Sequence, residues 1–332
     1  MSEAVGTAPA RNSWLTASGW RRLFRDRPIV PLIGLLVLLV VVSELVRPGT
    51  LSAQWAGVML RAAVPLAILA ACQTLTMLTG GIDLSVGAVA SMAGFVVATL
   101  SAGPGMGVGI VVALIAAALA GLVTGVGVGV FRVHPLIMTL GMGLVILGLA
   151  NVWQLQMVTT NSGVPAGLRT VGSGTYLDLF PYNLLVFVPL AILILLALRR
   201  TGYGRLLYAI GDNPIAARLS GARAWQVLIV LYVISALFAA IAGFLISGLT
   251  NVASVPLAES YVLPSVAAAV IGGTSIMGGR GGYGGTIVGA LILTVITALL
   301  TSLGYPEPVR QILFGSIIVV VAAAYTRVTA ET

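Results

Sequence analysis

The sequence predicts an all-α membrane protein whose helices form about ten membrane segments. Its 332 residues are 59% apolar and only 8% charged, and the mean hydropathy is +1.10. A soluble domain carries about 25% charged residues, so a soluble fold of this length could not cover its surface with so few. The apolar residues gather in long runs, and the arginines gather in the short stretches between them. Water is therefore not the solvent for most of the surface.

Ten apolar runs approach the length of a membrane-spanning helix, which is about 20 residues. One run, 58–79, starts beside Arg61, and two others, 84–102 and 260–278, contain Gly, Ser and Pro, so we expect broken or re-entrant segments among them. Residues 1–28 should form a cytoplasmic N-terminal tail, residues 29–326 a single transmembrane domain and residues 327–332 a cytoplasmic C-terminus. The ten runs are 29–46, 58–79, 84–102, 106–130, 135–153, 183–198, 226–248, 260–278, 283–302 and 309–326.

The positions of the arginines predict the orientation, because cytoplasmic loops are enriched in Lys and Arg. With ten spans and the N-terminus inside, thirteen of the seventeen basic residues fall on inner segments and four on outer segments. Both termini and the loop 199–225 should therefore face the cytoplasm, and the loop 154–182 the outside. The outer arginines are Arg47, Arg61, Arg169 and Arg310. The inner ones are Arg11, Arg21, Arg22, Arg25, Arg27, Arg132, Arg199, Arg200, Arg205, Arg218, Arg223, Arg280 and Arg327.

The residue inventory excludes several classes of function. The chain has one Cys, one His and no Lys, so disulfide frameworks, Cys/His metal clusters and a P-loop with its essential Lys are not expected. Cys72 lies within an apolar run and His134 stands alone, so we predict no catalytic residue, no metal and no cofactor. Any ATP would have to be hydrolysed by another chain. Nucleic-acid binding needs a clustered basic surface, whereas the net charge of +8 is spread over the loops. The acidic residues Glu44, Asp178, Glu259 and Glu307 show no pairing in the sequence.

A glycine-rich break separates the second and third runs. Two consecutive glycines, Gly80 and Gly81, release the backbone from the helix. Asp83 and Ser85 can then cap the next helix by accepting hydrogen bonds from its first N–H groups. An ionised side chain near membrane depth costs about 2.5–3.5 kcal/mol and usually has a partner and a function. We favour the cap over direct contact of Asp83 with a ligand. The motif reads Thr79-Gly80-Gly81-Ile82-Asp83-Leu84-Ser85-Val86-Gly87.

The inner loop carries a second motif, whose latter half predicts a short helix over 213–221. Asp212 or Asn213 can supply the N-cap, Pro214 suits the first turn, and Gly221 suits the C-terminal stop. About two turns of helix are unstable alone in water, so this helix must dock on something. It is either a plain interfacial element or a contact for a peripheral subunit. The motif runs from Gly202-Tyr203-Gly204-Arg205 through Tyr208-Ala209-Ile210-Gly211 to Ala216-Ala217-Arg218-Leu219-Ser220-Gly221.

A third motif lies between the eighth and ninth runs. Its glycines superficially resemble a phosphate-binding loop, but no strand precedes them, no Lys follows and apolar runs flank them. We therefore expect a tight turn at the inner surface, held by Arg280. The motif contains Ile271-Gly272-Gly273-Thr274-Ser275 and Gly278-Gly279-Arg280-Gly281.

At these three motifs the sequence resembles the ribose-type (monosaccharide) permeases of ATP-driven bacterial importers. The order and spacing of the motifs cover most of residues 30–326. The chain departs from the family at Asp212, where a second Gly is more usual; Asp is also an N-cap residue, so little depends on the difference. Branched-chain amino acid permeases of the same superfamily usually lack the Gly-Gly-Ile-Asp-Leu-Ser string, so sugar is favoured over amino acid.

The resemblance implies the permease subunit of an importer in the bacterial inner membrane, surrounded by membrane lipid. It implies three protein partners: a cytoplasmic ATPase with two nucleotide-binding cassettes, an external solute-binding protein, and a second permease subunit that is a copy or a sister chain. The loop 202–221 would press on the ATPase. The coupling residues would be Gly211, Asn213, Ala216, Ala217, Arg218 and Gly221. The helix break on the translocation path would comprise Gly80, Gly81, Asp83, Ser85 and Gly87, and the inner turn Gly272, Gly273, Gly278, Gly279 and Arg280.

Two rival interpretations remain open. A secondary transporter or channel could run on an ion gradient through Asp83. A scaffolding membrane protein is less well supported, because glycine breaks within the apolar region indicate a pathway.

Overall fold

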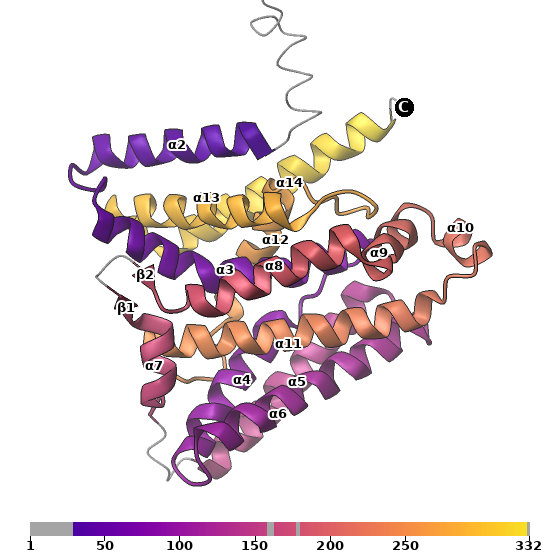
Figure 1. Ribbon diagram of the computed structural model, residues 1–332, viewed down its shortest axis with the longest axis horizontal. Helices are drawn as coiled ribbons and strands as arrows, with labels where there is room; N and C mark the ends of the chain where they lie inside the picture. Colours follow the sequence, from indigo (N-terminus) through magenta and orange to yellow (C-terminus); the bar gives the residue numbers. More distant parts are fainter. Residues whose placement is uncertain (1–28, 158–162, 177–179, 331–332) are drawn as a thin grey trace, which may run out of the picture.

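The computed structural model describes residues 29–157, 163–176 and 180–330 as a bundle of α-helices with one small antiparallel sheet (Figure 1). The predicted tail 1–28 lies outside the described residues. The first half of the bundle contains α2 (Ile29–Val46), α3 (Ala53–Leu78), α4 (Val86–Ser101), α5 (Met106–Gly129), α6 (Pro135–Met157) and α7 (Ala166–Ser173). The sheet pairs β1 (Thr175–Tyr176) with β2 (Phe180–Pro181). The second half contains α8 (Leu184–Arg200), α9 (Gly202–Asp212), α10 (Pro214–Leu219), α11 (Ala224–Thr250), η2 (Glu259–Tyr261), α12 (Val262–Ile271), α13 (Tyr283–Ser302) and α14 (Glu307–Ala330).

The all-α membrane fold is confirmed. Among the described residues, six helices are long and apolar enough to cross a membrane, and the count is seven if α8 and α9, which meet at a bend of 68°, form one span. A helix also lies over each of the other predicted runs, but α4 has 16 residues and α12 has 10. The count of ten membrane segments and the orientation of the termini stay predictions.

Two predicted boundaries are wrong for identifiable reasons. The apolar run 260–278, one of those expected to be broken or re-entrant, extends past the helix: α12 stops at Ile271, because Gly273 adopts a φ of +87° that a helix does not contain. Helix α3 begins at Ala53 rather than near residue 58, and Arg61 lies inside it. The Arg61 guanidinium donates a hydrogen bond to the carbonyl of Ser173, so a backbone acceptor at the end of α7 accommodates its charge.

Helix α11 is the centre of the bundle and packs against α3, α4, α5 and α7. Its contact with α5 depends on glycines four residues apart on α5. A Cβ at Gly121 would lie 2.5 Å from the carbonyl oxygen of Tyr232, and one at Gly125 would lie 2.7 Å from the Cα of Ile229. Small residues at this spacing let two helix backbones approach closely in lipid. These α5 glycines therefore serve close helix packing.

The two ends of the bundle differ in structure. Figure 1 shows α7 and the β1–β2 sheet at one end and α10 at the opposite end. The described parts of the predicted outer loop 154–182 and of the predicted inner loop 199–225 thus lie at opposite ends. This arrangement suits a chain that exposes one loop on each side of a membrane.

Candidate functional site

The three glycine motifs, which are far apart in the sequence, meet at one place. The N–H of Gly279 donates a hydrogen bond of 3.0 Å to the carbonyl oxygen of Leu78, at the end of α3. A Cβ at Gly211 of α9 would overlap that same carbonyl oxygen and would lie 2.6 Å from the nitrogen of Gly279. A Cβ at Gly278 would lie 2.8 Å from the Gly211 oxygen and 3.0 Å from the Gly80 nitrogen. We call this contact of Leu78–Gly80, Gly211 and Gly278–Gly279 the three-motif junction.

The junction admits no side chains because its backbones touch directly. Gly80, Gly278 and Gly279 have φ values of +78°, +94° and +71°, in the left-handed region that glycine adopts without strain. Gly211 is helical and is required only by the close approach. The sequence identified these glycines as members of three separate motifs. Only the structure shows that the three motifs contact one another.

The inner turn is held mainly by backbone contacts. Ser275 N donates to the carbonyl of Arg280 at 2.9 Å, so Arg280 contributes through its main chain. The expectation that its side chain holds the turn finds no hydrogen bond or ion pair in support among the described residues. Tyr208 of α9 donates to the carbonyl of Gly281 at 2.9 Å, and a Cβ at Gly272 would overlap the nitrogen of Thr286. The turn is thereby fixed to both α9 and α13.

Asp83 lies in the break between α3 and α4 and is almost completely buried. Its Oδ1 accepts hydrogen bonds from Ser85 N at 3.1 Å and from Ser85 Oγ at 2.6 Å, and its Oδ2 accepts one from Ser235 Oγ of α11 at 2.8 Å. The predicted cap is therefore partly wrong: the Ser85 side chain makes no cap bond to α4 and donates to Asp83 instead. The carboxylate ties the break to α11.

The backbone of the break is held by two further helices. The Gln73 amide of α3 donates to the Asp83 carbonyl at 2.7 Å and accepts from Asp83 N at 3.2 Å. Thr139 Oγ1 of α6 accepts from Leu84 N at 3.1 Å. A buried backbone that has left a helix needs such partners, because an unpaired buried amide is costly. The break is therefore a defined structure joined to α3, α6 and α11.

Helix α10 has the caps that the sequence predicts. Asn213 is the N-cap, and its Oδ1 accepts from Ile215 N and Ala216 N at 3.0 Å each. At the other end Gly221, with a φ of +86°, donates to the carbonyl of Arg218, and Ala222 N donates to that of Ala217, both at 3.0 Å. This pair of bonds is the Schellman motif.

One face of α10 packs against the protein, and the opposite face is exposed. Ala217 is 6% exposed and packs against the protein's own core, whereas Ile215 is 67% exposed and Leu219 is 85% exposed. Ala217 was grouped with the residues that would contact a partner, and the structure places its side chain on the inward face of α10. Exposed apolar side chains on a helix at the end of a bundle favour contact with another protein.

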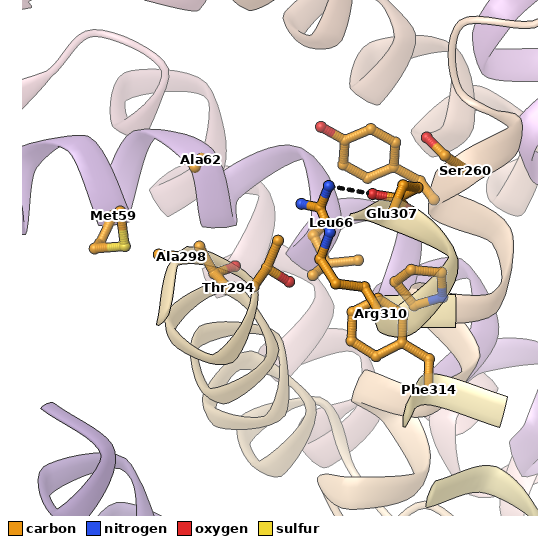
Figure 2. Close-up of a pocket in the computed structure, with 12 residues that line it drawn as sticks. Met59, Ala62, Leu66, Ser260, Thr294, Ala298, Glu307, Arg310 and Phe314 are labelled. Carbon is orange, nitrogen blue, oxygen red and sulfur yellow. Dashed lines mark ion pairs between the residues drawn. The ribbon is translucent and has the colours of Figure 1, made fainter. Parts of the chain in front are cut away.

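The sequence did not indicate a largely apolar cavity at the other end of the bundle, which holds one ion pair. Figure 2 shows it between α3, η2, α13 and α14, with an ion pair between Glu307 and Arg310. Its volume is about 320 Å³. The pairing could have been recognised, since Glu307 and Arg310 are three residues apart and so share a helix face once residue 307 begins a helix.

Cys72, the only cysteine of the chain, lies inside the bundle. Cys72 is fully buried, and its Sγ donates to the Ser235 carbonyl at 3.2 Å. Within the described ranges no group of three or more His, Cys, Asp or Glu residues could hold a metal ion.

Comparison with known proteins gives the geometry a context. Residues 56–322 match the family described as branched-chain amino acid transport system / permease component. The chain is 33% identical to the ribose import permease protein of Bacillus subtilis over 87% of its own length and 90% of that protein. It is 32% identical to the fructose import permease protein of Rhizobium meliloti, over 89% and 84% of the two chains. It is 34% identical to the galactofuranose transporter permease protein of Escherichia coli, over 91% and 90%. No solved structure matches significantly.

Proposed function

The chain belongs to the family described as branched-chain amino acid transport system / permease component, and on that premise we propose that it is the membrane-spanning permease subunit of an ATP-driven sugar importer. One observation carries the proposal. Relatives named for ribose, fructose and galactofuranose transport match it over 87–91% of its length. We assign it a monosaccharide as substrate and the bacterial inner membrane as location.

The driving force comes from a separate ATPase. The chain has no Lys, and a P-loop needs a Lys to reach the nucleotide phosphates. The assembly contains an ATPase with two cassettes, an external binding protein that delivers the sugar, and a second permease subunit. An ion-coupled mechanism through Asp83 is not favoured, because protein donors already satisfy the carboxylate and the relatives are import permeases.

In this proposal, the three-motif junction transmits a displacement of α10, caused by the ATPase, to the helix break at Asp83. Helix α10 presents Ile215 and Leu219 to the ATPase, and the adjoining α9 contacts the end of α3 through Gly211. The helix break at Asp83 begins immediately after that end. A push on α10 therefore reaches the break through backbone contacts, which cannot absorb it by rotating side chains.

Co-purification in mild detergent tests the assignment of partners. The tagged chain should retain an ATPase with two cassettes and, in the presence of sugar, the external binding protein. A chain that retains neither from cells that express both would contradict the proposal.

The orientation gives a labelling prediction. Arg169→Cys in α7 should react with an impermeant thiol reagent in intact cells, because α7 faces outward in the proposed topology. Leu219→Cys on α10 should react only after lysis. The native Cys72 is fully buried, so background labelling should be low. The reverse pattern would invert the topology.

The exposed face of α10 gives a coupling prediction. Leu219→Asp should lower ATP-driven uptake more than about tenfold, because burying an unpaired carboxylate in an apolar contact costs about 2 kcal/mol or more. Membrane insertion should persist, since Leu219 touches little of its own chain. Uptake is measured in vesicles at equal protein content.

Two comparisons make that prediction specific. Leu303→Asp, at an exposed leucine in the turn between α13 and α14, should leave uptake near normal. Ala217→Glu should instead detach α10 from its own protein, because Ala217 is buried. Normal uptake by the Leu219→Asp protein would remove α10 from the ATPase contact.

A further inference from the structure

A basic cavity lies beside α10 and next to the three-motif junction, whose Thr79 forms part of its lining. It occupies about 730 Å³ between the end of α5, the start of α6, α10 and the start of α11. Three arginines line it, namely Arg132, Arg218 and Arg223, and its lining contains no carboxylate. Three arginines around one space repel one another unless an anion joins them.

None of these three arginines makes an ion pair within the described ranges. The nearby carboxylate of Asp212 lines a neighbouring cavity, which Arg223 also lines. Arg218 Nε donates to the Pro214 carbonyl at 3.1 Å, which orients the guanidinium and leaves its two terminal nitrogens for another acceptor. Arg132 has a φ of +57°, a strained value for a residue with a side chain. The cavity therefore presents guanidinium donors that have no carboxylate partner within the described ranges.

The cavity is amphipathic as well as basic. Val128, Val130 and Leu228 form an apolar wall. Phe131 is 74% exposed and precedes Arg132 in the sequence, and Trp225, which lines the cavity, is 47% exposed. Aromatic side chains gather at the level where the bilayer meets water. The cavity lining thus combines apolar and aromatic side chains, which suit the acyl region of a lipid, with arginines, which suit an anionic headgroup.

The exposed face of α5 extends this arrangement along the bundle. Leu119, Val123 and Val130 are all exposed and recur at helical spacing on one face. We propose that the cavity binds the phosphate of an anionic phospholipid of the inner leaflet, with its acyl chains along this face of α5. The proposal rests on the cytoplasmic placement of α10 in the proposed function. An acidic protein surface would satisfy the charge but would leave the apolar wall without a partner.

Native mass spectrometry of the purified full chain tests the site. After delipidation, the protein is titrated with phosphatidylglycerol or with phosphatidylcholine of the same acyl chains. One phosphatidylglycerol should bind well ahead of phosphatidylcholine. The variant carrying Arg132→Gln, Arg218→Gln and Arg223→Gln together should bind it on the order of one hundredfold more weakly, since each arginine near a membrane surface contributes about tenfold or slightly less.

A matched variant supplies the control. Arg199→Gln, Arg200→Gln and Arg205→Gln remove the same number of charges from the predicted inner loop that carries Arg218 and Arg223, but from outside this cavity, and should leave phosphatidylglycerol binding unchanged. In the unaltered chain, phosphatidylglycerol binding should weaken as the salt concentration rises. This test does not depend on whether the variants fold. Inorganic phosphate at millimolar concentration should not displace the lipid; displacement would mean a free-anion site and would overturn the lipid assignment.

Two other results would overturn the proposal. In the first, both lipids bind equally, or both triple variants weaken binding equally. In the second, the cavity variant binds lipid normally but no longer co-purifies with the ATPase, so the arginines belong to a protein contact. Lipid binding is measured on the chain alone, so a failure to import sugar would count against the proposed function and not against this site.

Discussion

Alanine in place of Gly211 should abolish sugar uptake while the protein still inserts in the membrane and binds its ATPase. The new Cβ would overlap the Leu78 carbonyl oxygen and lie 2.6 Å from the Gly279 nitrogen. Both obstacles are backbone atoms, which cannot rotate away as a side chain can. Overpacking commonly costs about 1–3 kcal/mol, enough to separate α9 from α3 and to lower uptake more than about tenfold. ATP hydrolysis should continue without transport, because α10 is left unchanged.

The same substitution at Gly202 is the matched control. Gly202 begins the same helix, and its nearest neighbour for a new Cβ is the Arg205 guanidinium at 3.7 Å, which is ordinary contact. Uptake and ATP hydrolysis are measured together in vesicles. If Gly211→Ala and Gly202→Ala transport equally well, the three-motif junction does not carry the movement.

Leucine in place of Asp83 should also abolish uptake, and asparagine should preserve much of it. Leucine leaves three buried donors without an acceptor, namely Ser85 N, Ser85 Oγ and Ser235 Oγ. Each unpaired donor costs about 1–3 kcal/mol, and the sum approaches the whole stability of a domain, about 5–15 kcal/mol. Asparagine keeps one oxygen for the Ser85 donors, and its amide can donate to Ser235 Oγ, which also accepts.

The two Asp83 variants separate structure from ion coupling. Uptake and the melting temperature in detergent are measured for both. Equal and complete loss of uptake in both variants, with unchanged melting of the asparagine protein, would require the negative charge. That result would revive the ion-coupled interpretation.

The local features of the fold were predictable from the sequence. Apolar runs predict the positions of the helices because the interior of a bilayer admits little else. The caps of α10 could be recognised because Asn213 and Gly221 act on backbone atoms within a few residues of themselves. Helices α7 and α9 were not predicted, because their sequences are too short or too polar to form an apolar run of membrane-spanning length.

The long-range features were not predictable from one sequence. Gly211 touches Leu78 and Gly279, and nothing near any of the three residues specifies the others. Asp83 was interpreted as a helix cap because its sequence neighbours allow one, but its third donor is Ser235, 152 residues away. A side chain with several possible partners takes those that the tertiary packing brings close. The motifs indicated which residues matter, and the packing determines what they contact.

Sugar uptake into proteoliposomes tests the central claim most directly. The chain is reconstituted with its ATPase, and the external binding protein and radiolabelled ribose are added outside. The claim that a separate ATPase drives this permease predicts uptake that requires internal ATP and the binding protein, and that continues when a protonophore collapses the proton gradient. Uptake that proceeds without the ATPase, and that stops with the protonophore while ATP stays high, would contradict it.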